Sequence, residues 1–206
     1  MKLCVFTSEY EGNAPSLALL RESCYRAGVT LHTYGNGPWP GWLAGKTRDG
    51  IAFLQSLSGD FTHAMWVDGF DSLVLAPAST IMATYSTITD GVIVAAEANC
   101  WPDSELSEEF PPTQGKRFVN AGGYMGPIPL LIEEMQKVMG CCGASENDQA
   151  GWSVRYLEAW PRIQLDKDSW IWRSMSDPDD GRPSCVRHWN GKIPGREEFW
   201  KNYGQL

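Results

Sequence analysis

The sequence predicts an α/β domain in which a mainly parallel, twisted sheet is flanked by helices. Strand-like apolar runs alternate with helical patterns through the first half of the chain, as in parallel sheets covered on both faces. The 206 residues are 43% hydrophobic and 20% charged, which supports one domain with a sizeable core. Neither an internal repeat nor a shift in composition marks a boundary, so residues 1–206 are predicted to form a single domain.

Four apolar runs in the first half predict strands, at residues 2–7, 29–34, 63–67 and 91–97. Between them, apolar residues at helical spacing predict helices at 16–27, 46–57 and 77–87. Gly28 is placed to end the first of these helices. Glycine and proline residues exclude regular structure at 35–42, where we expect a loop at the rim of a binding site.

The second half of the chain is less regular. A short strand broken by glycines is predicted at 118–126, with further strands at 162–165 and 170–173. Helices are predicted at 128–139 and 148–159, and an amphipathic segment at 195–203. Proline-containing loops are expected at 99–115 and 176–183.

Charge and composition exclude some classes of protein. A net charge of −8 argues against a passive electrostatic grip on nucleic acid, although a local patch could still hold a nucleic-acid substrate. The first residues turn polar too soon for a signal peptide, and no apolar run approaches the length of a membrane helix. Six cysteines without a C-x-x-C pair favour reduced thiols over a zinc site. We therefore expect a cytoplasmic protein.

An acidic pair ends the third predicted strand. Residues 64–71 run Ala-Met-Trp-Val-Asp-Gly-Phe-Asp, so that Asp68 and Asp71 follow a buried apolar run. Ligands of open α/β sheets bind at the carboxyl ends of strands, and carboxylates suit Mg²⁺ or Mn²⁺, which in turn hold phosphates. Many nucleotide-sugar transferases hold a metal in this way. The alternative is a polar turn after a strand.

Four further segments place polar residues or glycines at expected strand ends: 96–103 (Ala-Glu-Ala-Asn-Cys-Trp-Pro-Asp), 118–126 (Phe-Val-Asn-Ala-Gly-Gly-Tyr-Met-Gly), 146–149 with 165–166, and 188–192 (His-Trp-Asn-Gly-Lys). In this order, after the acidic pair, they resemble the glycosyltransferase domain of procollagen lysyl hydroxylases and the related procollagen galactosyltransferases. The resemblance covers roughly residues 2–192. It implies a GT-A fold, a Mn²⁺ (or Mg²⁺) ion and a UDP-sugar donor.

The resemblance also implies a set of metal ligands. Asp68 and Asp71 match the acidic pair of the family, and His188 matches its third ligand. A neutral imidazole is a suitable partner for Mn²⁺. The alternative for His188 is a packed or surface histidine.

Three residues are matched to the donor nucleotide. Phe70 stands where the family usually has a tyrosine beside the uracil or ribose, so its ring can stack but a hydroxyl is lost. Lys46 matches a lysine that meets the donor phosphates, and Lys192 is a second candidate for this role. The alternative for Lys46 is a solvated residue at the start of a helix.

The sugar side of the site is matched to two motifs. Trp101 and Asp103 would shape the sugar and acceptor side, with Trp101 as a core tryptophan the alternative. Asn120, Gly122 and Gly123 resemble the segment that lets backbone approach the sugar, where a side chain would block it.

Asp148 matches an acidic residue near the transferred sugar. The family carries a run of acids there, whereas residues 147–149 are Asn-Asp-Gln. Asp148, Trp101 and Asn120 are therefore the candidate catalytic residues, with Glu97 and Asp166 as second choices. Gly122, Gly123 and Asp103 join the predicted donor-binding residues.

The function implied is a metal-dependent transfer of a hexose from a UDP-sugar to a hydroxyl acceptor, with retention of anomeric configuration. The collagen enzymes are secretory, so a short cytosolic version favours a bacterial or viral source. The acceptor stays open between a small molecule, a glycan, a protein side chain and hydroxymethylated DNA. Alternatives on the same fold are a nucleotide-sugar hydrolase, a nucleotidyltransferase and an inactive nucleotide-binding module.

Overall fold

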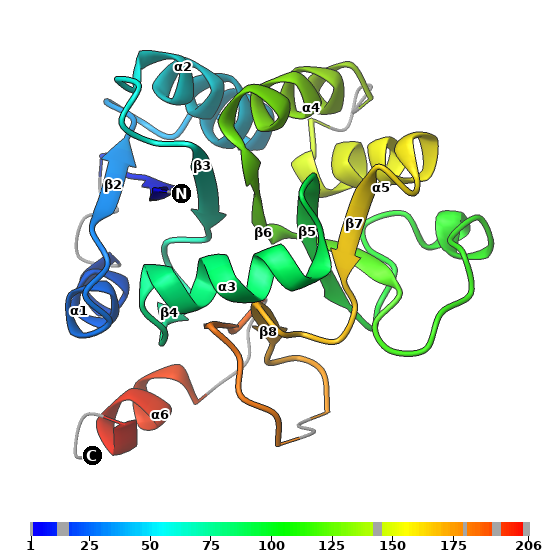
Figure 1. Ribbon diagram of the computed structural model, residues 1–206. Helices are drawn as coiled ribbons and strands as arrows, with labels where there is room; N and C mark the ends of the chain where they lie inside the picture. The colour runs from blue at the N-terminus through cyan, green and yellow to red at the C-terminus, as the bar shows by residue number, and fades with distance from the viewer. Residues whose placement is uncertain (1, 12–16, 142–145, 179–180, 191–194, 204–206) are drawn as a thin grey trace.

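A six-stranded sheet forms the centre of the protein (Figure 1). The computed structural model describes residues 2–11, 17–141, 146–178, 181–190 and 195–203. The strand order is β2-β1-β3-β6-β5-β7, with bounds β1 Leu3–Ser8, β2 Leu31–Tyr34, β3 His63–Val67, β5 Val92–Glu97, β6 Phe118–Pro127 and β7 Ile163–Asp166. Neighbours pair in parallel except at β6, which is antiparallel to both β3 and β5. The predicted α/β fold with a mainly parallel sheet is confirmed.

Helices cover both faces of this sheet. The helices α2 (Asp49–Ser56), α4 (Ile128–Cys141) and α5 (Asp148–Ala159) pack on one face, and α1 (Ala18–Arg26) and α3 (Ala78–Ile88) on the other. Side chains alternate along each strand, so Trp66 joins the first core while Met65 and Val67 join the second. Burial on both faces explains why the strands are continuous apolar runs. The helix α6 (Arg196–Tyr203) lies near the small sheet described next (Figure 1).

A second sheet of three short strands lies beside the first. It contains β4 (Ser72–Val74), β9 (Val186–His188) and β8 (Trp172–Ser174), in the order β4-β9-β8. Antiparallel pairing sets Ser72 opposite His188. This pairing brings the end of β9 to the connection that carries the acidic pair, although the two segments are far apart in the sequence.

Stacked aromatic rings join the strands that carry the site to the helix beside them. Trp66 of β3 stacks on Tyr124 of β6 at 5.9 Å between ring centroids, and Tyr124 lies 4.9 Å from Trp152 of α5. All three side chains are buried. Such pairs add about 0.5–1.5 kcal/mol each beyond the area they bury. The contacts fix the end of β3 relative to the start of α5.

Five elements differ from the sequence-based predictions. The strands β4 and β9 were not predicted, because three residues show no period. The helix predicted from residue 46 begins earlier, since a π-helix (η2, Trp42–Arg48) precedes α2. A 3₁₀ helix (η3, Ser104–Glu108) interrupts the predicted loop. The predicted broken strand at 118–126 is one strand with a bulge.

The bulge in β6 lies next to the site. Val94 pairs with Tyr124 but the next residue of β5, Ala95, pairs with Asn120, so residues 121–123 of β6 have no partner on β5. Extra residues in one strand bend it and re-aim its side chains, often beside functional sites. Among the described residues, no helix combines the length and the apolar character that crossing a bilayer requires.

Candidate active site

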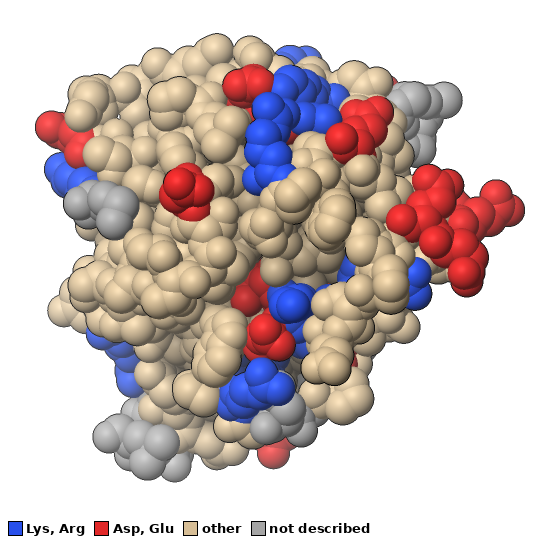
Figure 2. Space-filling model, turned by 45° about the vertical axis from the view of Figure 1, so that its right-hand side comes forward, with Lys and Arg blue, Asp and Glu red and all other residues tan. Residues whose placement is uncertain are grey.

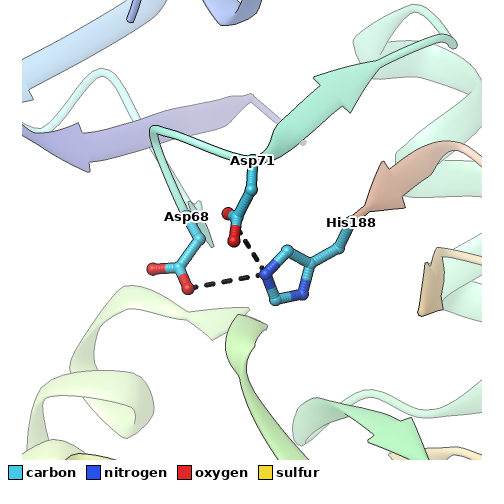
Figure 3. Close-up of side chains that lie close together, drawn as sticks. All are labelled: Asp68, Asp71 and His188. Atoms are coloured by element: carbon cyan, nitrogen blue, oxygen red, sulfur yellow. Dashed lines mark ion pairs between the residues drawn. The ribbon is translucent and has the colours of Figure 1, made fainter. Parts of the chain in front are cut away.

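Two carboxylates and an imidazole converge beside the end of β3. Asp68 follows β3, Asp71 precedes β4 and His188 ends β9, and all three point toward one another (Figure 3). The His188 Nε2 atom lies 3.2 Å from Asp71 Oδ1 and 3.6 Å from Asp68 Oδ2. One ligand atom from each residue lies within 4.8 Å of the others. Gly69 lets the connection between the two aspartates lie against the Leu17 side chain, because a Cβ there would approach Leu17 Cδ2 at 2.3 Å.

The donor atoms of this group fit a hard divalent cation. Carboxylate oxygens and an imidazole nitrogen are ligands that Mn²⁺ accepts, and Mg²⁺ also takes carboxylates. Burial alone would lower the pKa of His188, but Asp71 and Asp68 outweigh it and the pKa is raised. For Asp71, burial acts to raise the pKa, yet His188 and Lys46 hold it below its usual value. The negative charge at this point therefore attracts cations.

Lys46 of η2 is a buried cation at the same place. Its ammonium lies 2.8 Å from Asp68 Oδ1 and 3.5 Å from Asp148 Oδ2. The ammonium also lies over the rings of Trp42 and Trp66, at 4.9 and 5.7 Å from their centroids. Burial acts to lower the pKa of Lys46, but Asp148 and Asp68 raise it above its usual value. The lysine is a fixed positive charge facing the cavity, and not a solvated residue at a helix start.

Asp148 is the first residue of α5 and is 3% exposed. The helix begins here because the Asn147 side chain caps it, accepting from the backbone N–H groups of Gln149 and Ala150. Burial raises the pKa of the Asp148 carboxyl, and the nearby ammonium of Lys46 opposes this. The cap thus aims one carboxylate at the lysine and at the open cavity.

Glycines in the β6 bulge bring the two sheets together. A Cβ on Gly122 would lie 2.1 Å from His188 Cε1, and one on Gly123 would lie 2.4 Å from Trp172 Nε1. The Gly122 carbonyl also accepts from the backbone N–H of Asp68 at 3.0 Å. At Gly123 the absence of a side chain leaves room for Trp172, and the approach of backbone to a sugar stays a prediction.

Gln149 connects the walls of the site. Its Oε1 atom accepts from the backbone N–H of Ala121, and its Nε2 atom donates to Glu97 Oε1 and to the Trp101 carbonyl. Glu97 accepts in turn from Asn190 Nδ2 at 2.9 Å. One amide side chain therefore fixes the bulge of β6, the end of β5 and the loop after it in a single arrangement.

These groups surround a cavity of about 540 Å³, within the range of small-molecule sites. Its lining consists of Trp42, Lys46, Asp68, Asp71, Glu97, Asn99, Trp101, Asn120, Ala121, Gly122, Asn147, Asp148, Gln149, Ser176, His188 and Asn190. Trp42 and Trp101 are 48% and 53% exposed, so both indoles are accessible at this cavity.

Comparison with known proteins identifies the family. The family model for the PLOD GT domain matches residues 53–182, which is more than half of the chain. The chain belongs to the PLOD GT domain family. Membership and fold together make it a glycosyltransferase-family chain, as the resemblance implied.

Curated relatives in the family are much longer. The chain is 26% identical over 159 residues to the multifunctional procollagen lysine hydroxylase and glycosyltransferase LH3 of Rattus norvegicus, covering 74% of this chain and 20% of the relative. It is 29% identical over 172 residues to the multifunctional procollagen lysine hydroxylase and glycosyltransferase of Caenorhabditis elegans, covering 76% of this chain and 23% of the relative. The chain thus spans about a fifth of the length of these relatives.

A solved structure shows the same fold. The galactosyltransferase LgtC, solved with donor and acceptor sugar analogues, superimposes with a TM-score of 0.63 at 14% identity, covering 100% of this chain and 96% of that chain. The GT-A fold expected from the family motifs is therefore confirmed.

Most residues predicted for this family's site come together. Nine of them line the cavity: Lys46, Asp68, Asp71, Glu97, Trp101, Asn120, Gly122, Asp148 and His188. Within the lining, Asn120 Oδ1 accepts from the backbone N–H of Gly122 at 2.9 Å. The side chain of Asn120 thereby holds the shape of the bulge.

Other predicted residues lie elsewhere. Phe70 is 40% exposed and does not line the cavity. Asp103 also lies outside the lining, because its carboxylate caps η3 by accepting from the backbone N–H of Glu105. Lys192 lies outside the described residues. The structure thus assigns a structural contact to Asp103.

Asp166 holds a loop. Its buried carboxylate accepts three backbone N–H groups, from residues 170, 171 and 172, at 2.7–2.9 Å. Burial raises its pKa to about 6 despite these donors. This carboxylate shapes the chain that leads into β8 and does not line the cavity.

Sequence reasoning did not single out Gln149 as a site residue. Gln149 stands beside Asp148, in the segment where the family carries a run of acidic residues. Its position one residue after a predicted catalytic aspartate, at a helix start, was the available signal. Its partners Ala121 and Glu97 come from other strands, so only the folded chain reveals its role.

Proposed function

We propose that this chain is a metal-dependent glycosyltransferase that moves a hexose from a UDP-sugar to a hydroxyl acceptor, with retention, and that residues 1–206 act as one domain. The observation that carries the proposal is the convergence of Asp68, Asp71 and His188 beside the buried ammonium of Lys46. A cavity of about 540 Å³ opens directly on these groups. Family membership supports glycosyl transfer, and the geometry supports the metal.

Asp68, Asp71 and His188 would hold a Mn²⁺ or Mg²⁺ ion. A divalent ion supplies positive charge that stabilises a diphosphate leaving group. Lys46 adds a second fixed cation next to Asp68, and its burial removes the screening by water that would weaken it. The chain itself thus orients and neutralises the diphosphate end of a donor.

Asp148 and the Gln149 network define the sugar end. The Asp148 Oδ2 atom is buried, and its contact with Lys46 Nζ is long, at 3.5 Å. A buried acceptor with so distant a donor gains from a ligand that supplies a closer one, and sugar hydroxyls are such donors. We infer that Asp148 binds hydroxyls of the transferred sugar and that Gln149 positions the walls around it.

The exposed indole of Trp101 favours transfer over hydrolysis. It lines the cavity while 53% of the residue remains exposed, which leaves an apolar surface on which an acceptor can lie. A nucleotide-sugar hydrolase needs only water at this point and gains nothing from such a surface.

The test is turnover of radiolabelled UDP-glucose and UDP-galactose with Mn²⁺, measuring UDP release and the fate of the label. We expect metal-dependent UDP release that rises when an acceptor from a hydroxyl-compound panel is present, with label in a conjugate. Release of free sugar that no acceptor increases would instead identify a hydrolase. His188→Ala should lose the activity, whereas exposed Asp60→Ala should retain it.

A further inference from the structure

We propose that the protein binds a neutral oligosaccharide in a second groove, along the edge strand β7. The groove has a volume of about 910 Å³, larger than the cavity at the metal-ligand cluster. Its walls come from the second half of α3, the loop before β6, the end of α5, β7 itself and the turn after β7. It shares no lining residue with the first cavity.

The two sites lie at opposite ends of α5. Asp148 and Gln149, at its start, line the first cavity, whereas Tyr156 in its last turn and Trp160 beyond it line the groove. A helix of this length spans about 18 Å. The groove therefore forms a separate binding surface.

One end of the groove comes nearer to the transfer cavity. The strand β7 is parallel to β5, with Asp166 opposite Ala95, and Glu97 at the end of β5 lines the cavity. The residues that follow β7, including Trp170, therefore lie at the same end of the sheet as the cavity. An extended ligand in the groove would run along the sheet edge toward that end.

Two exposed tryptophans mark the ends of β7. Trp160, before the strand, is 55% exposed, and Trp170, after it, is 44% exposed. The four residues of β7 span about 13 Å, a length over which several sugar rings fit. The Arg182 guanidinium lies over the Trp170 ring at 5.8 Å and holds one side of it. Exposed indoles offer flat apolar faces, which the apolar faces of sugar rings match.

Charges in the groove balance. The lining contains two lysines and two aspartates, namely Lys116, Lys167, Asp166 and Asp168. Lys116 Nζ pairs with Asp177 Oδ2 at 2.9 Å, and both carboxylate oxygens of Asp166 accept backbone N–H groups. Figure 2, which brings the β7 side forward, shows acidic and basic side chains next to one another around a hollow near the centre of this face, and a group of acidic side chains alone at its right edge.

The uncharged side chains that line the groove indicate which class of ligand it would bind. Hydroxyls of Thr84, Thr87 and Thr113 and the amide of Gln164 lie among the two indoles and the prolines at 111–112. A nucleic acid or a strongly charged peptide would require an excess of one charge. Hydroxyl and amide groups next to aromatic faces suit an uncharged polyol, so we assign the groove to a neutral glycan chain. Such a site would keep a glycan acceptor or product close to the enzyme.

The test is titration of neutral glucose hexamers (β-1,4, α-1,4 and β-1,3 linked) into the whole protein without metal, followed by tryptophan fluorescence and calorimetry. We expect at least one hexamer to bind, and Trp170→Ala and Trp160→Ala each to weaken it about tenfold. Tyr25→Ala removes an aromatic residue that is 80% exposed on α1 and should leave the affinity unchanged.

Asp71→Ala separates this site from the transfer cavity. Binding of the hexamer should persist in this variant, because Asp71 lines only the first cavity. Absence of binding by all three hexamers, or loss of binding in Asp71→Ala but not in Trp170→Ala, would overturn the proposal. None of these results depends on whether the chain transfers sugar.

Discussion

Two groups of buried charge in this protein have opposite compositions. In the arginine cluster, between α4 and α5, Glu134 is fully buried and pairs with Arg155 Nε at 2.6 Å and Arg162 Nη2 at 2.7 Å. Lys137 Nζ approaches at 3.4 Å. The buried Glu134 carboxylate thus has three cationic neighbours, of which Lys137 and Arg155 also pair with the outer carboxylates of Glu133 and Glu158.

The carboxylate cluster at the cavity has the reverse balance. Among the described residues, the Lys46 ammonium pairs with Asp68 and Asp148, and the His188 imidazole lies beside Asp68 and Asp71. Buried carboxylates are costly without compensation, and the arginine cluster shows that this chain can supply it. In the part of the chain that the structure describes, the carboxylates at the cavity outnumber the lysines and arginines paired with them, which supports the proposal that an external cation binds there.

The largest effect expected is that of Asp71→Ala. Metal-dependent binding of UDP should weaken by about 100-fold or more, because one of three proposed metal ligands is lost. In the absence of metal the free energy of unfolding should fall by only about 1 kcal/mol, because the variant loses the partly exposed contact of Asp71 with His188. Calorimetry with UDP and Mn²⁺, with thermal unfolding in EDTA, measures both. Unchanged UDP binding would remove Asp71 from the metal site, and Asp60→Ala is the control.

Glu134→Gln should lower stability and leave UDP binding unchanged. Breaking a buried ion pair by removing one partner costs about 3–5 kcal/mol of unfolding free energy, since the arginines keep their charge. The folded fraction should still bind UDP with normal affinity, because Glu134 does not line the cavity. Urea unfolding and UDP titration give the two values. A stable variant with weakened UDP binding would contradict the division into a structural and a binding cluster.

Lys46→Met tests whether the charges at the cavity affect both stability and cation binding. The variant leaves Asp68 and Asp148 without their ammonium, so stability without metal should fall by about 3 kcal/mol. Mn²⁺ should restore part of this loss, because it supplies charge to the same carboxylates. Thermal unfolding of the variant and the unmodified chain, with and without Mn²⁺, measures the loss of stability in each condition. An equal loss in both conditions would mean that no cation binds beside Asp68.

The smallest effect is expected for Trp101→Ala. Its side chain is largely exposed, while its carbonyl holds Gln149 and is retained in the variant. Transfer to an acceptor should fall about tenfold with little change in UDP binding, since only the acceptor surface is lost. The transfer rate and the UDP affinity of the variant are measured in parallel with those of the unmodified chain. An equal loss of both would assign Trp101 to the donor side.

The sequence predicts an element well when that element depends on interactions between residues close together in the chain. The strand at 63–67 and the helix at 148–159 have the bounds predicted, because periodicity and capping are local. The approach of His188 to the acidic pair was expected from the family motif alone. The pairing of β4 with β9 brings His188 to the acidic pair. The residue pattern did not predict this pairing, because strands of three residues are too short to show an alternation of apolar and polar side chains.

Residues whose partners lie on other strands were predicted less well. Gln149 was not singled out, since Ala121 and Glu97 reach it only in the folded chain. Chemistry-bearing residue types are visible in a sequence, whereas the hydrogen bonds that decide their role are not.

The most direct test of the central claim is calorimetric titration of UDP into the unmodified chain, first with Mn²⁺ and then with excess EDTA. Excess negative charge at Asp68, Asp71 and Asp148 predicts binding with the metal and loss of at least about 100-fold in affinity without it. Equal binding in both conditions, or no binding in either, would contradict the claim that the carboxylate cluster holds a cation for a nucleotide diphosphate.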